Sequence, residues 1–300
     1  MNVTTKSLKN LLAIILCLSV LCSSLTACSF SFEDLASSTL PETDVLTVHF
    51  IDVEQGDSTL ITFPDGKTML IDGGPQYNSY NLINYISNLG IETIDLLVAT
   101  HPHEDHIGGL ADVLDNFAVG EVFMPSIPES DTPTTRVYEQ FLTAVINEDC
   151  AVTEASAGTV ILKEENISAE CVAPGGTNYG NLNLYSAVVR LQFNSIKFLF
   201  MGDAESENES EILAGGFDVD ADIIKVGHHG SNTSSSRKFI KKVSPTVGVI
   251  SCGEDNRYGH PHEEILNLFE SSSTDIYRTD LNGTVIVECR GNNYTVSQEQ

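Results

Sequence analysis

The chain has 300 residues, of which 41% are hydrophobic, and its acidic residues outnumber its lysines and arginines by 42 to 15. The resulting net charge of −27 repels polyanions, because binding duplex DNA requires several Lys or Arg contacts with phosphates. A long nucleic acid is therefore disfavoured as a partner. A small phosphodiester held directly at a site is compatible with this charge.

The first residues predict an export signal. Lys6 and Lys9 precede an apolar stretch over residues 11–25, and a basic segment before a short apolar one is typical of signal peptides. A stretch of about 15 residues is shorter than the roughly 20 that cross a bilayer. We therefore expect residues 1–27 to be a signal peptide. We expect residues 28–44, rich in serine, threonine and acidic residues, to be a flexible tether.

The cysteines bear on the export prediction. The run Leu25-Thr26-Ala27-Cys28 resembles a bacterial lipobox, which implies lipidation of Cys28 and anchoring to the outer face of the bacterial cytoplasmic membrane. An ordinary secreted protein cut nearby is the alternative. Beyond Cys28 the chain holds Cys150, Cys171, Cys252 and Cys289. An exported protein permits disulfides among these four, while their isolated positions in apolar segments fit free core thiols equally well.

The elements alternate between strands and helices along residues 45–295, which we expect to form one domain. In the first half, strands are predicted over residues 45–51, 58–63, 68–71 and 96–100, and helices over residues 80–88, 107–117 and 136–147. In the second half, strands are predicted over residues 159–162, 168–172, 186–193, 197–201, 223–226, 246–251 and 284–288, and helices over residues 207–214, 235–243 and 262–270. Two mixed sheets packed face to face, with helices on both outer faces, accommodate this order. The predicted fold class is therefore α/β, as a four-layer αββα sandwich.

The most informative segment is His101-Pro102-His103-Glu104-Asp105-His106, which directly follows an apolar strand. Buried histidine and aspartate are costly unless they are paired, so such a cluster at a strand end is difficult to explain by packing. His101 and His103 stand two residues apart and leave the same side of an extended chain. Neutral imidazoles and carboxylates are the ligands of divalent metals such as zinc. A second apolar strand leads to His228 and His229, so both strand ends can present histidines to one groove.

The hexad is the His-x-His-x-Asp-His signature, and with three further motifs the chain resembles the metallo-β-lactamase superfamily. The other motifs are Asp72-Gly73-Gly74, Met201-Gly202-Asp203 and the run from Val226 to Ser231, each behind a predicted strand. The resemblance implies the αββα sandwich, two divalent metal ions and hydrolysis by a water that those ions activate. Zinc is the expected metal, and manganese is the alternative.

Three segments narrow the resemblance. Residues 52–58, 225–231 and 256–262 resemble the hydrolase-like domain of ComEC-type competence proteins, and residues 228–240 resemble phosphorylcholine esterases that act on teichoic acids. Glu54 departs from the competence pattern, which has glycine there. No part of the 300 residues resembles the multi-helix channel of competence proteins. The implied substrate is a small or cell-envelope phosphodiester, with a nuclease related to DNA uptake, or a non-catalytic binding protein of this fold, as alternatives.

The resemblance also assigns the metal ligands. Metal one takes His101 and His103, metal two takes Asp105, His106 and one of His228 or His229, and Asp203 bridges both. His228 is preferred because it is the first histidine after its strand, as His101 is after its own.

One histidine of the family is missing, because residues 107–202 contain none. Asn183 stands in its place and could offer a weak amide oxygen, or a water could fill the position. Metal one would then be labile and accept manganese as readily as zinc. The turn that holds Asn183 and Ser186 could equally be structural.

The remaining predicted roles concern catalysis and substrate. Asp105 orients the attacking water, and His229 or His260 protonates the leaving group. Asn183, Ser186 and Ser231 are candidate substrate contacts. The turn at His260 could instead only begin the helix that follows it, and Ser231 could be an ordinary polar loop residue.

Overall fold

The computed structural model describes residues 44–299, which fall in one compact unit. The predicted signal peptide, the tether up to residue 43 and the candidate lipidation site Cys28 lie outside the described residues, so these remain predictions. Among residues 44–299, no helix combines the length and the apolar character needed to span a bilayer.

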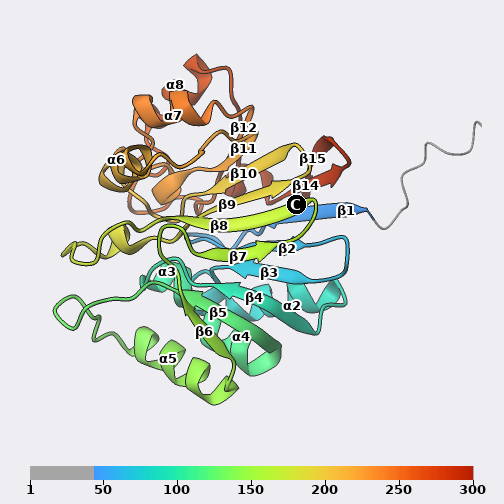
Figure 1. Cartoon of the computed structure of the whole chain (residues 1–300), viewed down its shortest axis with the longest axis vertical. Coiled ribbons are helices and arrows are strands. Elements are labelled where there is room, and N and C mark those ends of the chain that lie inside the picture. The colour runs from blue at the N-terminus through green and yellow to red at the C-terminus, as the bar shows by residue number, and fades with distance from the viewer. Residues whose placement is uncertain (1–43, 300) are drawn as a thin grey trace, which may run out of the picture. The chain divides into compact units, whose positions relative to one another are not determined.

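Two mixed β-sheets form the centre of the molecule (Figure 1). The first sheet has the order β15-β14-β1-β2-β3-β4-β5-β6 and the second has the order β13-β12-β11-β10-β9-β8-β7. The strands of the first sheet are β1 Val45–Phe50, β2 Thr59–Thr62, β3 Thr68–Ile71, β4 Thr93–Val98, β5 Ala118–Met124, β6 Ala151–Glu154, β14 Thr284–Arg290 and β15 Asn293–Glu299. Those of the second are β7 Val160–Lys163, β8 Ile167–Ala173, β9 Val188–Phe193, β10 Ile196–Phe200, β11 Ile223–Lys225, β12 Val247–Ile250 and β13 Asp275–Arg278.

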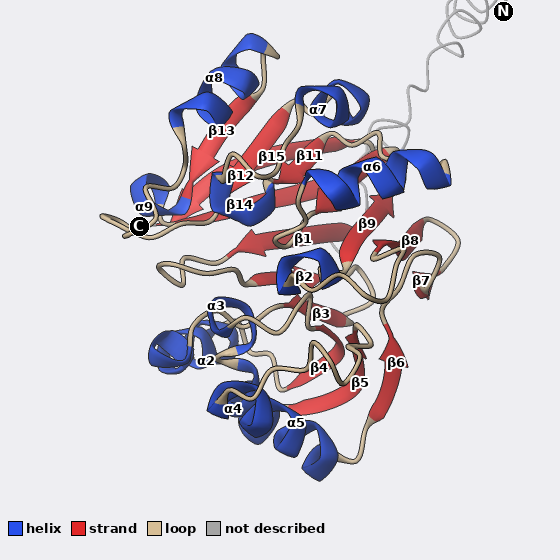
Figure 2. Cartoon of the chain, turned by 90° about the vertical axis from the view of Figure 1, so that its left-hand side faces the viewer, coloured by secondary structure: helices blue, strands red, loops and turns tan. Residues whose placement is uncertain are grey.

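Helices cover the outer face of each sheet (Figure 2). The helices are α2 Ser79–Asn88, α3 Glu104–Ile107, α4 Leu110–Asn116, α5 Arg136–Glu148, α6 Ser206–Gly215, α7 Arg237–Val243, α8 Glu263–Ser271 and α9 Thr279–Asn282, with short 3-10 turns η1 Gln76–Asn78, η2 Leu182–Tyr185 and η3 Gly227–Gly230. One apolar core lies between the sheets and includes Phe50, Phe123 and Phe198. A second core packs α2, α4 and α5 on the first sheet, and a third packs α6, α7 and α8 on the second. These layers confirm the predicted αββα sandwich.

The sheet topology brings the predicted motifs to one edge of the sandwich. Strands β10 and β11 are parallel neighbours, so the segments that follow them leave the second sheet at the same end. Asp203 comes just after β10, and His228 and His229 come just after β11. In the first sheet, β4 leads into the hexad.

Several boundaries differ from the prediction. The helix expected over residues 107–117 corresponds to α4, and a separate short helix, α3, comes directly before it. The break falls at Gly108 and Gly109, where a Cβ atom would approach the backbone of Gln76 and of Gly73 to 2.3 Å. Strands β5, β6, β13 and β15 were not predicted. Both β6 and β15 lie at sheet edges and are mostly exposed, so their apolar pattern is weak.

Cys150, Cys171, Cys252 and Cys289 are free thiols in the described part of the chain. Three of them are buried, which matches the core-thiol alternative.

Candidate metal centre

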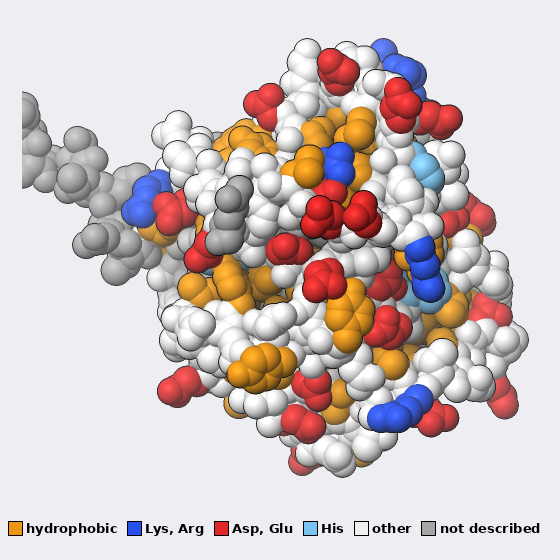
Figure 3. Space-filling view, turned by 180° about the vertical axis from the view of Figure 1, so that it is seen from behind, with side chains coloured by type: hydrophobic (Ala, Val, Ile, Leu, Met, Phe, Trp, Pro, Cys, Tyr) orange, Lys and Arg blue, Asp and Glu red, His pale blue; other side chains and the backbone are white. Residues whose placement is uncertain are grey.

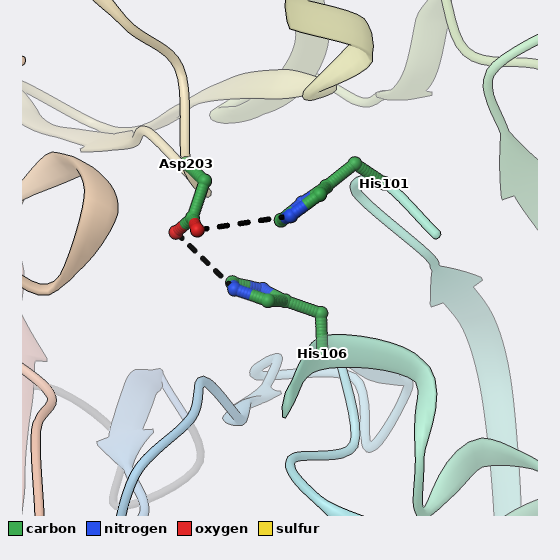
Figure 4. A group of neighbouring side chains, drawn as sticks. All are labelled: His101, His106 and Asp203. Atoms are coloured by element: carbon green, nitrogen blue, oxygen red, sulfur yellow. Dashed lines mark ion pairs between the residues drawn. The ribbon is translucent and has the colours of Figure 1, made fainter. Parts of the chain in front are cut away.

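Asp203 joins the two halves of the candidate site, because each of its carboxylate oxygens faces a histidine of the hexad (Figure 4). Its Oδ2 atom lies 3.7 Å from Nε2 of His101, and its Oδ1 atom lies 3.2 Å from Nε2 of His106. Nδ1 of His103 is 3.0 Å from Nε2 of His101. Asp203, His101 and His106 are buried. The structure thus brings together segments about a hundred residues apart, as the sequence motifs predicted.

His228 and His229 approach different oxygens of the Asp203 carboxylate. Nε2 of His229 lies 3.4 Å from Asp105 Oδ2 and 3.5 Å from Asp203 Oδ1, so His229 joins Asp105 and His106. Nε2 of His228 lies 3.6 Å from the other oxygen, Asp203 Oδ2. We call His101 and His103 the first group, and Asp105, His106 and His229 the second group.

The preference for His228 in the second group is therefore corrected, since the structure puts His229 there. That preference rested on the analogy with His101, which comes directly after its own predicted strand. The backbone takes left-handed conformations, with φ of 50° at His228 and 52° at His229. Such a conformation redirects both side chains, and sequence spacing gives no indication of it.

An outer layer of hydrogen bonds holds the imidazoles of both groups. Nδ1 of His106 lies 2.8 Å from Asp72 Oδ2, and Nδ1 of His229 lies 2.9 Å from the carbonyl oxygen of Ser251. The Thr100 hydroxyl donates to Asp72 and can accept from Nδ1 of His101, 3.1 Å away. In the absence of a cation the raised pKa of His106 favours a second proton on its ring, whereas hydrogen on Nδ1 alone leaves each Nε2 lone pair directed toward Asp203. This is the tautomer that a metal ligand requires.

Asp57 and Lys225 form a buried ion pair beneath His229. Lys225 Nζ lies 2.7 Å from Asp57 Oδ2, and Asp57 Oδ1 lies 3.2 Å from Nδ1 of His229. Burial raises the pKa of the Asp57 carboxyl, but Lys225 and His229 outweigh burial and lower this pKa to about 2. Sequence reasoning assigned neither residue a role. The signal was a lysine within the apolar run Ile223-Ile224-Lys225-Val226, because lysine is almost never fully buried without a partner.

The site electrostatics follow from these carboxylates. Burial lowers the pKa of His106, but Asp203 and Asp72 reverse the effect and raise it well above its usual value. For His101, burial dominates and the pKa lies well below its usual value. Negative charge therefore concentrates around the second group.

The donor set fits divalent cations. Nε2 of His106, Nε2 of His229 and Oδ1 of Asp203 are buried and make no hydrogen bond of good geometry among residues 44–299, although Nε2 of His106 and Oδ1 of Asp203 lie only 3.2 Å apart. Buried polar atoms without partners are rare because each costs about 1–3 kcal/mol. Imidazole nitrogens and a carboxylate oxygen that converge in this way are the ligand types of zinc and related metals.

A cavity of about 640 Å³ opens onto the site. It is lined by Gln55, Tyr77, His103, Glu104, Asp105, Asn183, Asp203, His228, His229, Asn256, Arg257, Tyr258 and His260. Arg257 is the only lysine or arginine in this lining. Its guanidinium carbon lies 4.8 Å from the centre of the Tyr258 ring. Acidic side chains are spread over the face drawn in Figure 3, with several lysine or arginine side chains among them.

The predicted substrate contacts are partly corrected. Ser186 and Ser231 are buried and do not line the cavity. The Ser186 hydroxyl accepts a hydrogen bond from the backbone N–H of Asp203, 3.1 Å away, and so positions that residue. Asn183 does line the cavity. Sequence reasoning missed Arg257 and Tyr258 as individual residues, although the motif that contains them was noted.

His260 lines the cavity beside the late histidines, and its ring centre lies 5.5 Å from that of His228. Burial and the neighbouring His229 and His228 lower the pKa of His260 to about 4. Its ring is therefore neutral at pH 7 and can donate a hydrogen bond.

Comparisons with known proteins agree with this geometry. A family model described as the metallo-beta-lactamase superfamily matches residues 51–254. The chain is 31% identical over 255 residues to ComE operon protein 3 of Bacillus subtilis, covering 79% of this chain and 32% of that protein. It is 26% identical over 258 residues to competence protein ComA of Neisseria gonorrhoeae, covering 85% of this chain and 34% of that protein. The chain thus spans about a third of the length of these relatives.

Solved structures show the same fold at low identity. YhfI, a metallo-beta-lactamase fold protein of Bacillus subtilis, aligns with a TM-score of 0.52 at 12% identity over 85% of this chain and 100% of its own. CmlA, a diiron beta-hydroxylase from Streptomyces venezuelae, aligns with a TM-score of 0.54 at 14% identity over 82% of this chain and 54% of its own. The family match, the competence-type relatives and the shared sandwich confirm the resemblance drawn from the motifs: this chain belongs to the metallo-beta-lactamase superfamily.

Proposed function

We propose that this protein is a metal-dependent hydrolase that cleaves phosphodiester bonds in a small or cell-envelope substrate. The observation that carries the proposal is the convergence of buried Nε2 atoms, which make no hydrogen bond of good geometry, and the Asp203 carboxylate at the floor of an open cavity. The competence-type relatives and the single arginine at the cavity support a phosphate-bearing substrate. Attachment to the membrane through Cys28 remains part of this proposal.

The first and second groups would hold one divalent cation each, with Asp203 between them. When bound, such cations polarise a phosphoryl oxygen and lower the pKa of a water so that it is deprotonated near neutral pH. Zinc is the metal we propose, because imidazole nitrogens dominate the donor set.

The chain's own residues supply the rest of the chemistry. The Asp105 carboxylate faces the cavity, is held ionised by His229 and His106 despite its burial, and can accept a hydrogen bond from the attacking water. The Arg257 guanidinium can bind a phosphate oxygen, since arginine recognises phosphate by paired N–H donors. Neutral His260 can donate a hydrogen bond to the leaving oxygen.

The test measures metal content and turnover together. The purified protein, loaded with zinc or with manganese, is assayed on bis-p-nitrophenyl phosphate, a β-lactam and single-stranded DNA. We expect phosphodiester cleavage, with loss of more than about 100-fold in Asp203→Asn, because even the outer contacts of metal ligands contribute about 10–100-fold. Asp115→Asn, at an exposed carboxylate on α4, is the matched control and should keep full activity.

Three other results of this assay would change the conclusion. Bound metal without turnover on any substrate would favour a binding protein that retains the fold. Preferential degradation of DNA would favour the nuclease alternative that the competence-type relatives suggest. Full activity in Asp203→Asn would contradict the proposed centre.

A further inference from the structure

The first group lacks a third imidazole in the sequence, because no histidine lies between residues 107 and 202. Asn183 stands at that position and lines the cavity together with His103. Its Nδ2 atom donates to Glu205 Oε1 at 3.0 Å, and the same atom lies 3.5 Å from Nε2 of His228. An amide binds a cation through its oxygen; Asn183 Oδ1 is buried without a hydrogen-bond partner among residues 44–299, and the end that faces Glu205 and His228 is the NH₂ group, which carries only donors. Reversing the amide would place its oxygen against the Glu205 carboxylate, which is repulsive.

On the side of His228, Asn183 presents its NH₂ group and no ligand atom, and His228 itself approaches the first group from that side. Its Nε2 atom lies 3.6 Å from Asp203 Oδ2, the oxygen that also faces Nε2 of His101 at 3.7 Å. Figure 4 shows that this oxygen points toward His101, away from the His106 side. His228 therefore approaches the first group, whereas His229 belongs to the second.

The far side of the His228 ring is held as in the other site histidines. Nδ1 of His228 lies 3.0 Å from the Thr233 hydroxyl and 3.5 Å from Glu205 Oε1. A carboxylate near Nδ1 favours hydrogen on that nitrogen and leaves the Nε2 lone pair for the cavity. The Asn183 NH₂ group near Nε2 is consistent with an unprotonated nitrogen there.

The backbone explains how two neighbouring residues can serve opposite sides. His228 and His229 both have left-handed conformations, and their rings lie 6.2 Å apart at an interplanar angle of 67°. For residues other than glycine this conformation is strained. Two successive residues in this conformation imply that the surrounding contacts maintain the divergence.

We propose that His228 replaces the missing histidine, so that the His228–His229 pair is shared between two cations. His101, His103 and His228 hold one cation at Asp203 Oδ2, and Asp105, His106 and His229 hold the other at Asp203 Oδ1. This inference rests on the proposed function for the presence of two cations. A first site with three imidazoles prefers zinc to manganese, in contrast to the labile site expected from Asn183 alone.

The experiment measures cation binding rather than turnover. Metal-free protein is titrated with zinc in a competition assay, and with cobalt by visible absorption. The variants are His228→Asn, His229→Asn and His228→Asn combined with Asn183→His. Asparagine is chosen because it tolerates the left-handed backbone better than most residues. His262→Asn is the control, since Nδ1 of His262 only accepts from the backbone N–H of Asn232.

We expect the wild type and His262→Asn to bind two equivalents. His228→Asn should keep one tight equivalent and lose at least about tenfold in affinity for the other, and His229→Asn should also lose one. The cobalt spectra of the two variants should differ, because different ligand sets remain. Adding Asn183→His to His228→Asn should restore the second equivalent, which a merely structural role of His228 would not produce.

Three results separate the possibilities. Two unchanged equivalents in His228→Asn, with folding verified by circular dichroism, overturn this inference. So does a double variant that binds no better than His228→Asn. A wild-type protein that binds no divalent cation contradicts the proposed function itself.

Discussion

The hexad and the late histidine pair contribute to the same centre, but only one of them follows simple local rules. In the hexad, His101 leaves the end of β4 and His103 directly precedes α3, so spacing alone places both imidazoles. In the late pair, two left-handed residues send neighbouring side chains to opposite oxygens of Asp203. Motif recognition therefore identifies a centre reliably, while the assignment of ligands within a motif depends on backbone conformation.

The two regions also differ in the buried carboxylate that holds their histidines in place. Asp72 serves the hexad, since it accepts from both Thr100 and His106. Asp57, paired with Lys225, serves His229. Each carboxylate lies in a segment distant from the histidines it supports. Replacing one support at a time therefore tests whether the two regions behave as separate halves.

The largest effect is expected from replacing Asp72, the carboxylate that holds the hexad in place. Asp72→Ala leaves the Thr100 N–H, its hydroxyl and Nδ1 of His106 without their acceptor. We expect a loss of about 3–5 kcal/mol in the free energy of unfolding and of about 10–100-fold in zinc affinity. Urea denaturation and zinc competition measure both quantities. Unchanged zinc affinity in a folded variant would show that the hexad does not depend on Asp72.

Much of this comparison was accessible from the sequence. The four motifs gave the fold, the hexad and Asp203, because each motif follows an apolar strand whose end is set by local pattern. The partners of Asp72, Asp57 and Lys225 were not accessible, because they lie between about 30 and 170 residues away in the sequence, although the position of Lys225 in an apolar run indicated that it has a buried partner. The preference for His228 over His229 in the second group differs from the geometry for another reason, since nothing in residues 226–231 indicates two left-handed conformations.

A comparable effect is expected from breaking the ion pair between Asp57 and Lys225 beneath His229. Lys225→Met leaves the buried Asp57 carboxylate unpaired, and we expect the free energy of unfolding to fall by about 3–5 kcal/mol. Adding Asp57→Asn should recover part of that loss, because no buried charge then remains. Lys163→Met, at an exposed lysine, is the control. Equal stability of Lys225→Met and the wild type would contradict the importance of the ion pair.

The pH dependence of stability tests the same buried carboxylate, Asp57. Because the pKa of Asp57 falls from 3.8 to about 2 on folding, its stabilisation is present above pH 3.8 and is lost as the pH falls through about 2. Urea denaturation between pH 5 and pH 2 should therefore show a steeper loss of stability in the wild type than in Asp57→Asn. Identical slopes would exclude a depressed pKa at Asp57.

A smaller effect is expected at Arg257, which lines the cavity but lies outside both groups of ligands. We expect Arg257→Ala to raise KM about tenfold with little change in zinc affinity, since one charge-assisted hydrogen bond contributes about 1.5–3 kcal/mol. Steady-state kinetics measure the change, with Arg290→Ala as a control distant from the cavity. A fall in zinc affinity instead of a rise in KM would move Arg257 from substrate binding to structure.

The smallest effect is expected at His260. Its pKa falls from 6.5 to about 4 on folding, so the metal-free wild type loses stability as the pH drops below 6.5. His260→Gln removes this loss and should be relatively more stable at pH 5 than at pH 7.5. Thermal unfolding of both proteins at the two pH values measures the difference. A variant that is relatively less stable at pH 5 would contradict the lowered pKa.

The central claim is that segments distant in sequence enclose a pair of cations at Asp203. Anomalous diffraction at the zinc edge, from crystals of the zinc-loaded protein, tests it most directly. We predict two peaks about 3.5–4 Å apart on either side of the Asp203 carboxylate, one facing His101 and one facing Asp105. A single peak remote from Asp203, or none despite full zinc loading, would contradict the account.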